Sequence, residues 1–515
     1  MSKQPYYITT AIAYANGAPH IGFALEYIYT DAMARYQRLL GNDVVFVTGM
    51  DEHGQKIARK AAEAKLEPKA FVDGIAKQYQ DLASRLSISY TDFIRTTEDR
   101  HKETVTAFWN RVIENGKKDP RGPFLYTKKY TGLYCVGCES FKTEKDLVDG
   151  KCLDHPNLTP EQIEEENYFF KLTAFEKDLL AIYEKNPNFA TPETKFNEAI
   201  QLVKGGLEDI SVSRSSKHVP WGIPVPGDDS QNIYVWFDAL VNYLSALGFP
   251  KDEKKVATYW PTVHHVIGKE INRFHTVLWP AMLMAAGVDV PKQVAVHGWI
   301  LAKGGGKMSK TLGNVLEPDM LLTTFGVEAT RYLLLREIPF NGDGEYDQDR
   351  FVARFEADLS NNLGNLVLRV ASMIEKYRTG VVGVSPTAPW DVDALWATYQ
   401  TFMNDWRFDQ ALETAWTLIR DANKYIDDEK PWALAKENKD ADLDRVLFAL
   451  AEAIRHIGWM IRPFMPQTSD AILTLLGQNV NEISFEKIKT WGGLPAGTKL
   501  GTATALFPRL EEGKK

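Results

Sequence analysis

The feature that most constrains the fold is a strand–helix–strand pattern at the start of the chain. Residues 6–12 have the pattern of a strand, and residues 43–49 form a continuous apolar run typical of buried parallel strands. Between them, from about residue 20 to about residue 40, apolar side chains recur on one helical face, and Gly41 marks the end. Two strands joined by one helix predict an α/β fold with a doubly wound, Rossmann-like parallel sheet.

The rest of the chain divides into further segments. Its 515 residues are too many for one hydrophobic core, so several domains are expected. Strand patterns return at residues 263–268 and 293–298, and helical patterns alone follow residue 351. The predicted divisions are the first half of the sheet domain (1–116), an insertion (117–230), the second half of the sheet domain (231–320), a linking segment (321–355) and an all-α helical-bundle domain with a short tail (356–515).

Composition narrows the class of protein. A net charge of −8 and a pI near 5.8 exclude a global positive field, so any contact with nucleic acid must use local patches. No stretch reaches the roughly 18 apolar residues of a membrane span. The first residues run directly into a strand pattern, which leaves no room for a signal or transit peptide. A cytoplasmic enzyme is therefore expected.

Two short motifs flank most of the predicted sheet domain. His20 and Gly22 fall where the first strand gives way to the helix, and a helix N-terminus binds phosphate through free N–H groups and a positive dipole. Lys307 and Lys310 lie in a glycine-rich loop, where two cations can stabilise a pyrophosphate leaving group and Ser309 adds a hydroxyl donor. Taken alone, the first motif is better explained by a packing glycine beside a helix-starting histidine, and the second by a solvated basic loop. Together, they predict two loops closing over one ATP.

The cysteines form a second cluster of chemically informative residues. All three lie between residues 135 and 152, and with one histidine they make a CxxC-x13-CxxH array of Cys135, Cys138, Cys152 and His155. Three thiolates and one imidazole are a closed tetrahedral set, which is typical of structural zinc and leaves no position for a catalytic water. The alternative is a group of buried or free cysteines near a surface histidine.

Six segments together carry a resemblance to a known family. They are residues 14–22, 48–54, 268–282, 307–314, 365–369 and 430–432. In this order they resemble the motifs of class I aminoacyl-tRNA synthetases, and among these the methionyl-tRNA synthetase family. The resemblance runs from about residue 5 to the end of the chain.

The resemblance implies a two-step ligase reaction. L-Methionine would be activated with ATP to methionyl-adenylate and then transferred to the 3′-terminal adenosine of initiator and elongator tRNA(Met). The methionine carboxylate would attack the α-phosphorus without a protein nucleophile, with Mg²⁺ accompanying ATP. The expected catalytic contacts are His20, Lys307 and Lys310, and the expected ATP site is His20, Gly22, His297, Gly298, Lys307, Met308, Ser309 and Lys310.

The resemblance also implies a methionine pocket. Asp51 would hold the substrate ammonium as a charge-assisted partner. An aromatic-rich wall would surround the polarizable thioether, with Tyr14 and His275 as its polar members. The full expected set is Ile12, Tyr14, Asp51, Trp236, Ala239, Leu240, Tyr243, Ile271, Phe274, His275 and Trp279.

Two further expectations concern the insertion and the helical domain. Some members of the family carry one zinc knuckle in the insertion, which agrees with a single structural Zn²⁺, and residues 321–355 would contact the tRNA stem.

Asn365 and Arg369 are four apart and share one helix face, while Trp432 follows a proline near a helix start. By resemblance these three side chains read the anticodon, with Trp432 stacking on a base. From the residues alone, an exposed helix pair and a core tryptophan explain them equally well.

One position departs from the family pattern. Phe23 stands where the first motif usually ends in a second histidine, and phenylalanine cannot donate to phosphate. The expected adenylation therefore depends more on His20, the helix N-terminus and the loop lysines. A synthetase for another amino acid and a non-catalytic tRNA-binding protein remain as alternatives, and a monomer without membrane contact is expected.

Overall fold

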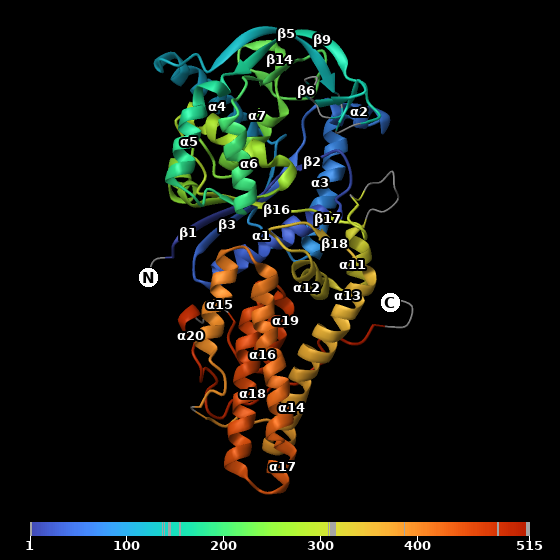
Figure 1. Cartoon of the computed structure of the whole chain (residues 1–515), viewed down its shortest axis with the longest axis vertical. Coiled ribbons are helices and arrows are strands. Elements are labelled where there is room, and N and C mark those ends of the chain that lie inside the picture. Colours follow the sequence, from blue (N-terminus) through green and yellow to red (C-terminus); the bar gives the residue numbers. More distant parts are fainter. Residues whose placement is uncertain are drawn as a thin grey trace.

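An α/β half and a helical half make up the molecule. The computed structural model describes residues 3–135, 137, 140–142, 146–153, 156–306, 308, 316–385, 387–480 and 484–510. In Figure 1 the α/β half lies above the helical half, with long antiparallel strands at its top. A parallel sheet flanked by helices and followed by a helical bundle confirms the predicted fold class.

The central sheet has seven strands in the order β10-β16-β15-β1-β3-β2, and β4 also pairs with β3. Its pairs are parallel. The strands are β1 (Pro5–Thr10), β2 (Ala13–Tyr14), β3 (Asp43–Asp51), β4 (Asp92–Arg95), β10 (Ala190–Thr191), β15 (Val263–Gly268) and β16 (Gln293–His297). Because the chain order reverses around β1, the carboxyl ends of β1, β3 and β15 form the switch point where open α/β sheets bind ligands.

Helix α1 (Ile21–Leu39) joins β1 to β3 and begins and ends close to the predicted positions. His20 is its N-cap, and Gly41 follows it at φ +91°, a conformation that favours glycine. The other helical elements around the sheet are α2 (Gln55–Glu63), α3 (Pro68–Arg85), α4 (Asp99–Lys118), α7 (Val235–Leu240), α8 (Asn242–Ser245), α9 (Glu253–Tyr259), η3 (Trp260–Thr262), η4 (Lys269–Ile271), the π-helical turn η5 (Phe274–Leu278) and α10 (Trp279–Ala286).

The segment between α4 and β14 forms small antiparallel sheets above the central one. Its elements are β5 (Leu125–Cys135), β6 (Ser140–Lys142), β7 (Leu147–Val148), β8 (Lys151–Cys152), β9 (Glu161–Phe170), η2 (Leu172–Phe175), α5 (Glu176–Lys185), α6 (Glu193–Lys204), β11 (Ile210–Ser211), β12 (Ser213–Ser215), β13 (Pro224–Val225) and β14 (Asp228–Ile233). Among the described strands of this segment, β10 alone returns to the central sheet, where it pairs with β16.

The helical half begins with a short β17–β18 strand pair, whose two strands enclose α11 and α12 in the chain order. Its elements are β17 (Ile300–Leu301), α11 (Pro318–Phe325), α12 (Val327–Glu337), β18 (Gly344–Glu345), α13 (Gln348–Arg354), the π-helical segment η7 (Phe355–Gly364), α14 (Asn365–Arg378), α15 (Val392–Asn404), α16 (Phe408–Glu429), α17 (Pro431–Lys436), α18 (Asp440–Ile461), α19 (Pro466–Leu475) and α20 (Phe485–Lys489). No helix among the described residues is long and apolar enough to cross a membrane.

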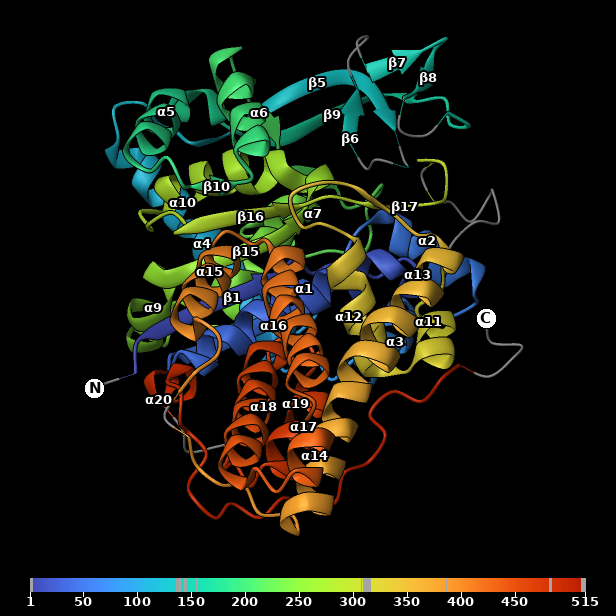
Figure 2. The same ribbon diagram turned by 60° about the horizontal axis from the view of Figure 1, so that its bottom comes forward.

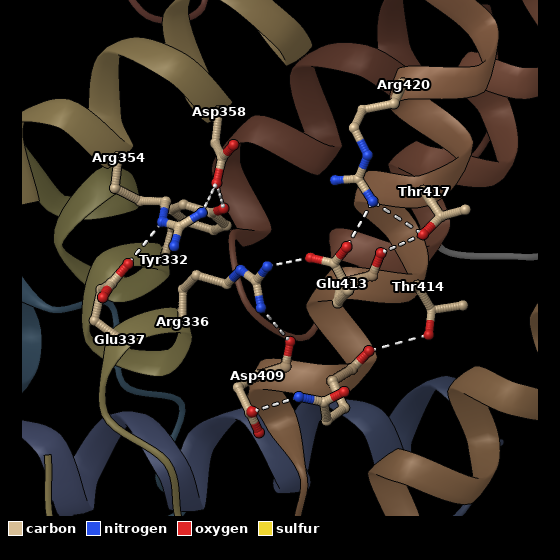
Figure 3. Close-up of polar contacts among 11 residues, drawn as sticks. Tyr332, Arg336, Glu337, Arg354, Asp358, Asp409, Glu413, Thr414, Thr417 and Arg420 are labelled. Carbon is tan, nitrogen blue, oxygen red and sulfur yellow. Dashed lines mark hydrogen bonds and ion pairs between the residues drawn. The ribbon is translucent and has the colours of Figure 1, made fainter.

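The two halves share one apolar core. Buried side chains from α1, α12, α16 and α18 belong to a single hydrophobic cluster, and α12 packs against both α1 and α16, which lie beside it in Figure 2. Figure 3 shows the polar contacts around α12: Arg336 pairs with Glu413 and donates to the carbonyl oxygen of Asp409 at 3.0 Å, while the Tyr332 hydroxyl donates to Asp358 at 2.6 Å. The helical half is therefore fixed to the sheet half through α12.

Candidate active site

The N-terminus of α1 carries the first motif. The Nδ1 atom of His20 accepts a hydrogen bond from the Gly22 N–H at 3.1 Å, so a neutral ring carries its proton on Nε2. The side chain is exposed at the switch point of the sheet. A ring that donates through Nε2 beside a positive helix end is suited to bind phosphate oxygens.

Gly22 is required by a close approach rather than by a special backbone angle. A Cβ atom at this position would lie 2.9 Å from Cε1 and 3.0 Å from Nδ1 of His20. Any larger residue would force the imidazole off the helix end. The glycine of this motif therefore positions the His20 ring.

A cavity of about 270 Å³ opens beside this helix end. Its lining includes every predicted methionine-site residue except Phe274 and Trp279. The full lining is Ala11, Ile12, Tyr14, Phe23, Glu26, Asp51, Lys56, Gly137, Val235, Trp236, Ala239, Leu240, Asn242, Tyr243, Glu270, Ile271 and His275. The predicted residues that line this cavity thus come from four distant segments of the chain: residues 12–14, Asp51, residues 236–243 and residues 271–275.

Phe274 and Trp279 do not line the cavity but pack behind residues that do. The Phe274 ring stacks on Trp236 at 3.8 Å with an interplanar angle of 7°. Trp279 is fully buried, its ring centroid lies 6.2 Å from that of Tyr243, and its Nε1–H donates to His265 Nε2 at 3.3 Å. Both side chains hold lining residues in place.

His275 is neutral and fixed in one tautomer. Its Nδ1 lies 3.1 Å from the carbonyl oxygen of Ile271, which can only accept, so Nδ1 carries the proton. Its Nε2 then accepts from the Tyr243 hydroxyl at 2.7 Å. Burial lowers the pKa of His275 to about 4, which keeps the ring uncharged at neutral pH.

The cavity carries more negative than positive side chains. Asp51 ends β3 and is nearly buried, and its carbonyl oxygen accepts from the Ala15 N–H at 2.8 Å. Glu26 and Glu270 also line the hollow, against the single cation Lys56 among its lining residues. Such a balance favours a ligand that brings a positive charge, such as an ammonium group.

Glu26 links three elements at the cavity floor. One carboxylate oxygen accepts from the Ala11 N–H at 2.9 Å, and the other lies 3.0 Å from His297 Nε2. Because His297 Nδ1 is 2.7 Å from the Gly298 carbonyl oxygen and must donate to it, the pair shares a further proton between Nε2 and the carboxylate. Burial raises the pKa of Glu26, and hydrogen bonding to Glu26 overcomes burial to raise that of His297.

His297 and Gly298, predicted to contact ATP, do not line the cavity. The His297 ring is buried against Glu26. A Cβ at Gly298 would lie 2.0 Å from the carbonyl oxygen of Gly342, so the backbone packs directly on the segment that precedes β18. The end of β16 is therefore tied to its surroundings on both sides.

The second motif is only partly described. Lys307, Ser309 and Lys310 lie outside the described residues. Met308 is half-buried and packs on the core cluster that includes α1. The preceding turn is closed by a hydrogen bond from the Ala302 N–H to the Gly306 carbonyl oxygen at 2.8 Å.

Two of the four predicted zinc ligands are described. Cys135 ends β5 and Cys152 ends β8, and both side chains are buried. Cys138 and His155 lie outside the described residues. Within the described ranges no group of three or more His, Cys, Asp or Glu side chains is arranged so that it could hold a metal ion. Buried thiols at the ends of two strands of the insertion fit the two ligands that they would supply to a zinc knuckle.

The predicted anticodon residues lie on the helical half. Asn365 is the exposed first residue of α14, and Arg369 one turn later pairs with Asp427 at 2.9 Å. Asp427 is on the last turn of α16, directly before α17, where Trp432 stands with 47% of its surface exposed. The ion pair brings α14 to the end of the bundle that carries Trp432.

Comparisons with known proteins match the whole chain. A family model described as "tRNA synthetases class I (M)" matches residues 6–158 and 146–371, and one described as "Anticodon binding domain of methionyl tRNA ligase" matches residues 387–515. The methionine–tRNA ligase of Caldanaerobacter subterraneus subsp. tengcongensis is 45% identical over 100% of this chain and 80% of its own length. That of Brucella suis is 41% identical over 99% of both chains.

The chain belongs to the methionyl-tRNA synthetase family. Among solved structures, the Mycobacterium tuberculosis methionyl-tRNA synthetase in complex with methionyl-adenylate superposes with a TM-score of 0.90 at 41% identity, covering 98% of this chain and 100% of that one. The apo form of the same enzyme gives 0.85 at 39% identity, covering 99% of each chain.

The position at which this synthetase departs from the family motif lies on the cavity wall. Phe23 lines the hollow, and its ring centroid is 4.8 Å from that of His20 and 5.3 Å from that of Tyr79. Its ring therefore contacts the histidine that the motif retains.

Sequence reasoning missed several polar lining residues. Glu26, Lys56, Asn242 and Glu270 all face the cavity. A signal existed for Glu26, which is a charged residue on the buried face of the first helix, and for Glu270, which lies within a segment already matched to the family. Lys56 and Asn242 had none, because only the tertiary fold brings them to the site.

Proposed function

We propose that this methionine–tRNA ligase forms methionyl-adenylate in the 270 Å³ cavity at the carboxyl ends of β1 and β3. The observation that carries the assignment is the composition of the lining, in which an apolar, aromatic wall and buried carboxylates share one hollow. Free methionine has these two parts, a soft thioether and an ammonium group.

The proposed contacts to methionine follow from the lining. Asp51 accepts hydrogen bonds from the ammonium group. Trp236, Ala239 and Leu240 from α7, together with Tyr243 and His275, surround the side chain. The lining residues Ile12, Tyr14 and Ile271 complete the site. Phe274 packs behind Trp236, and Trp279 packs behind Tyr243.

In the proposed adenylation step methionine reacts with ATP directly, and no side chain of the protein acts as a nucleophile. A methionine carboxylate oxygen forms a bond to the ATP α-phosphorus while the bond from that phosphorus to the bridging oxygen breaks, and pyrophosphate leaves with the electron pair. His20 donates from the start of α1, and Lys307 and Lys310 neutralise charge on the leaving group. Gly22, His297, Gly298, Met308 and Ser309 shape the nucleotide side of the site, and Mg²⁺ enters with the triphosphate.

The transfer step requires tRNA bound along both halves. The aminoacyl group passes from the adenylate to the hydroxyl of the 3′-terminal adenosine of tRNA(Met), and AMP leaves. Asn365, Arg369 and Trp432 read the anticodon. The pair of Arg369 with Asp427 is exposed and therefore weak, so the guanidinium can exchange its carboxylate for a base edge at little cost.

The remaining assignments are parts of the same proposal. One structural Zn²⁺ is held by Cys135, Cys138, Cys152 and His155, and it stabilises the knuckle of the insertion. The proposal also includes domain boundaries at residues 116, 230, 320 and 355, a monomeric state and a cytoplasmic location. Metal analysis by mass spectrometry should find about one zinc per chain, and well under one would refute the site.

The decisive experiment is ATP–pyrophosphate exchange with a panel of amino acids. Methionine should support exchange strongly, and norleucine should support it detectably, because an apolar pocket discriminates isosteres poorly. Asp51→Asn should raise the KM for methionine roughly tenfold or more, since one charged hydrogen bond contributes about 1.5–3 kcal/mol. Preference for another amino acid would redirect the assignment. Silence with all amino acids, with tRNA binding retained, would indicate a non-catalytic tRNA-binding protein.

A further inference from the structure

A buried carboxylate between two histidines lies directly behind the cavity. Asp238 is fully buried, its Oδ2 is 2.6 Å from His53 Nδ1, and its Oδ1 is 2.6 Å from His101 Nε2. Burial acts to raise the pKa of Asp238, but His53 and His101 outweigh it and lower the pKa to about 2. The carboxylate is therefore ionised at neutral pH, and each histidine donates an N–H to it.

The three residues come from elements that frame the cavity. His53 follows Asp51 by two positions at the end of β3, Asp238 belongs to α7 between the lining residues Trp236 and Ala239, and His101 belongs to α4. These elements appear together in the upper half of Figure 1. Because Asp238 itself is absent from the lining, it faces away from the cavity that its helix helps to form.

Each histidine is itself held in place. His101 Nδ1 lies 3.0 Å from the Ser245 hydroxyl at the end of α8, and that hydroxyl donates to the Val241 carbonyl oxygen at 3.0 Å. The His53 ring packs edge-on against Trp221, with ring centroids 5.7 Å apart. The Trp221 indole N–H in turn donates to the Glu52 carbonyl oxygen at 2.5 Å. The cluster is thus rigid at both ends.

The arrangement does not fit a ligand or metal site of its own. One nitrogen of each imidazole is within hydrogen-bond distance of a separate oxygen of the Asp238 carboxylate, which leaves no gap for an ion between the histidines and the carboxylate. The hollow that His53 lines on its other side has a volume of only about 10 Å³, which holds about one water molecule. The cluster must therefore act through the elements that it joins.

We propose that Asp238, bridging His53 and His101, is a positioning residue that sets the separation between Asp51 and the α7 wall of the methionine pocket. This inference rests on the proposed function of that pocket. Asp51 would hold the ammonium group from β3, and Trp236 and Ala239 would hold the thioether side from α7. The bridge from His53 to Asp238 is a direct polar link between these two walls, so its loss lets them move apart.

The test compares two substitutions at each histidine: one that keeps an N–H donor for Asp238 and one that removes it. The amide nitrogen of Asn occupies nearly the position of histidine Nδ1, and that of Gln nearly the position of Nε2. His53→Asn and His101→Gln therefore keep the hydrogen bond to Asp238, whereas His53→Leu and His101→Leu remove it. KM values for methionine and for ATP are measured separately by pyrophosphate exchange on the full chain, and methionine affinity is measured by calorimetry.

The leucine variants should raise the KM for methionine and weaken its binding at least about tenfold, with the KM for ATP within about twofold of wild type. The Asn and Gln variants should stay within about threefold. Asp238→Asn should resemble the leucine variants, and if it fails to fold, the His53 pair decides alone. Asp358→Asn is the matched control, because it removes another buried carboxylate, in η7 of the helical half, and should leave the KM for methionine unchanged.

Equal effects of His53→Asn and His53→Leu would overturn the inference, as would parallel rises in both KM values, which indicate general loosening. Unchanged methionine binding in every variant would also overturn the inference. The proposed function would still stand in that case, provided that the wild-type protein is active with methionine. A wild type that neither exchanges nor binds methionine would refute both.

Discussion

The buried ion pair between Arg331 and Asp31 gives the sharpest stability prediction. Both side chains are 0% exposed, and the guanidinium lies 2.7 Å from the carboxylate. The same guanidinium donates to the carbonyl oxygens of Leu86 at 3.1 Å, Pro463 at 3.2 Å and Phe464 at 2.7 Å. Arg331 on α12 therefore joins α1 and the loop after α3 to the end of α18, across the boundary between the two halves.

Replacing Arg331 by Met keeps the volume and removes the charge. Breaking a buried pair from one side costs about 3–5 kcal/mol, because a buried charge is left uncompensated. Asp31 would still accept from Arg35 at 2.7 Å and from the Ser89 hydroxyl at 2.6 Å, which favours the lower end of that range. We expect a loss of about 3 kcal/mol in the free energy of unfolding.

The assay is urea unfolding followed by circular dichroism and by tryptophan fluorescence. Arg445→Met is the matched control, because its pair with Glu429 at 2.7 Å is partly exposed and should contribute less than about 1 kcal/mol. Combining Arg331→Met with Asp31→Asn should cost less than the sum of the single changes. A loss for Arg331→Met no larger than for Arg445→Met would refute the reasoning.

The pH dependence of the same pair has a definite sign. Burial acts to raise the pKa of Asp31, but Arg331 and Arg35 outweigh it and hold the pKa below its ordinary value. The pair therefore stabilises the fold above about pH 4, where the unfolded side chain is also ionised, and this contribution is lost as the pH falls through the lowered folded value. Wild type should lose stability more steeply below pH 4 than Arg331→Met does.

Three further substitutions test the site. Gly22→Ala should slow adenylation by roughly 10- to 100-fold in pyrophosphate exchange, because its Cβ displaces the His20 ring, and an unchanged rate would refute that role. Phe23→His should raise adenylation turnover in the same assay, whereas an unchanged rate would show that a second histidine is dispensable here. Trp432→Ala should lower kcat/KM for tRNA in aminoacylation by roughly 5- to 150-fold, the equivalent of about 1–3 kcal/mol of base stacking. It should leave pyrophosphate exchange within about twofold, and equal losses in both assays would contradict an anticodon role.

The periodic pattern of apolar residues in the sequence was enough to predict the long helices and strands in which that pattern is clear. The first helix shows a clear apolar face and a terminal glycine, and the structure places it at Ile21–Leu39. Strand patterns at 263–268 and 293–298 correspond to β15 and β16. The short edge strand Ala190–Thr191 could not be predicted, because two residues carry no periodicity and only pairing with β16 defines them.

All the predicted methionine-pocket residues except Phe274 and Trp279 line one cavity, because family motifs identify residues that the sheet topology brings together. The motifs could not predict which residue each polar side chain of the site forms a hydrogen bond with. His297 was expected to face ATP, yet its ring is committed to Glu26, which is 271 positions away in sequence. Likewise, nothing in the sequence pairs His53 with Asp238, since such contacts depend on packing between elements that share no local pattern.

Helix α1 shows how these contacts act together. Its first residue follows His20 at the proposed phosphate end, Glu26 lies on the cavity floor, and Asp31 holds Arg331 at the junction with the helical half. At 1.5 Å per residue, His20 and Asp31 are only about 16 Å apart along one rigid axis. Tyr29 adds a hydrogen bond to the Ile338 carbonyl oxygen at 2.8 Å, directly after α12. Helix α1 therefore connects the proposed phosphate end of the site directly to α12 of the helical half.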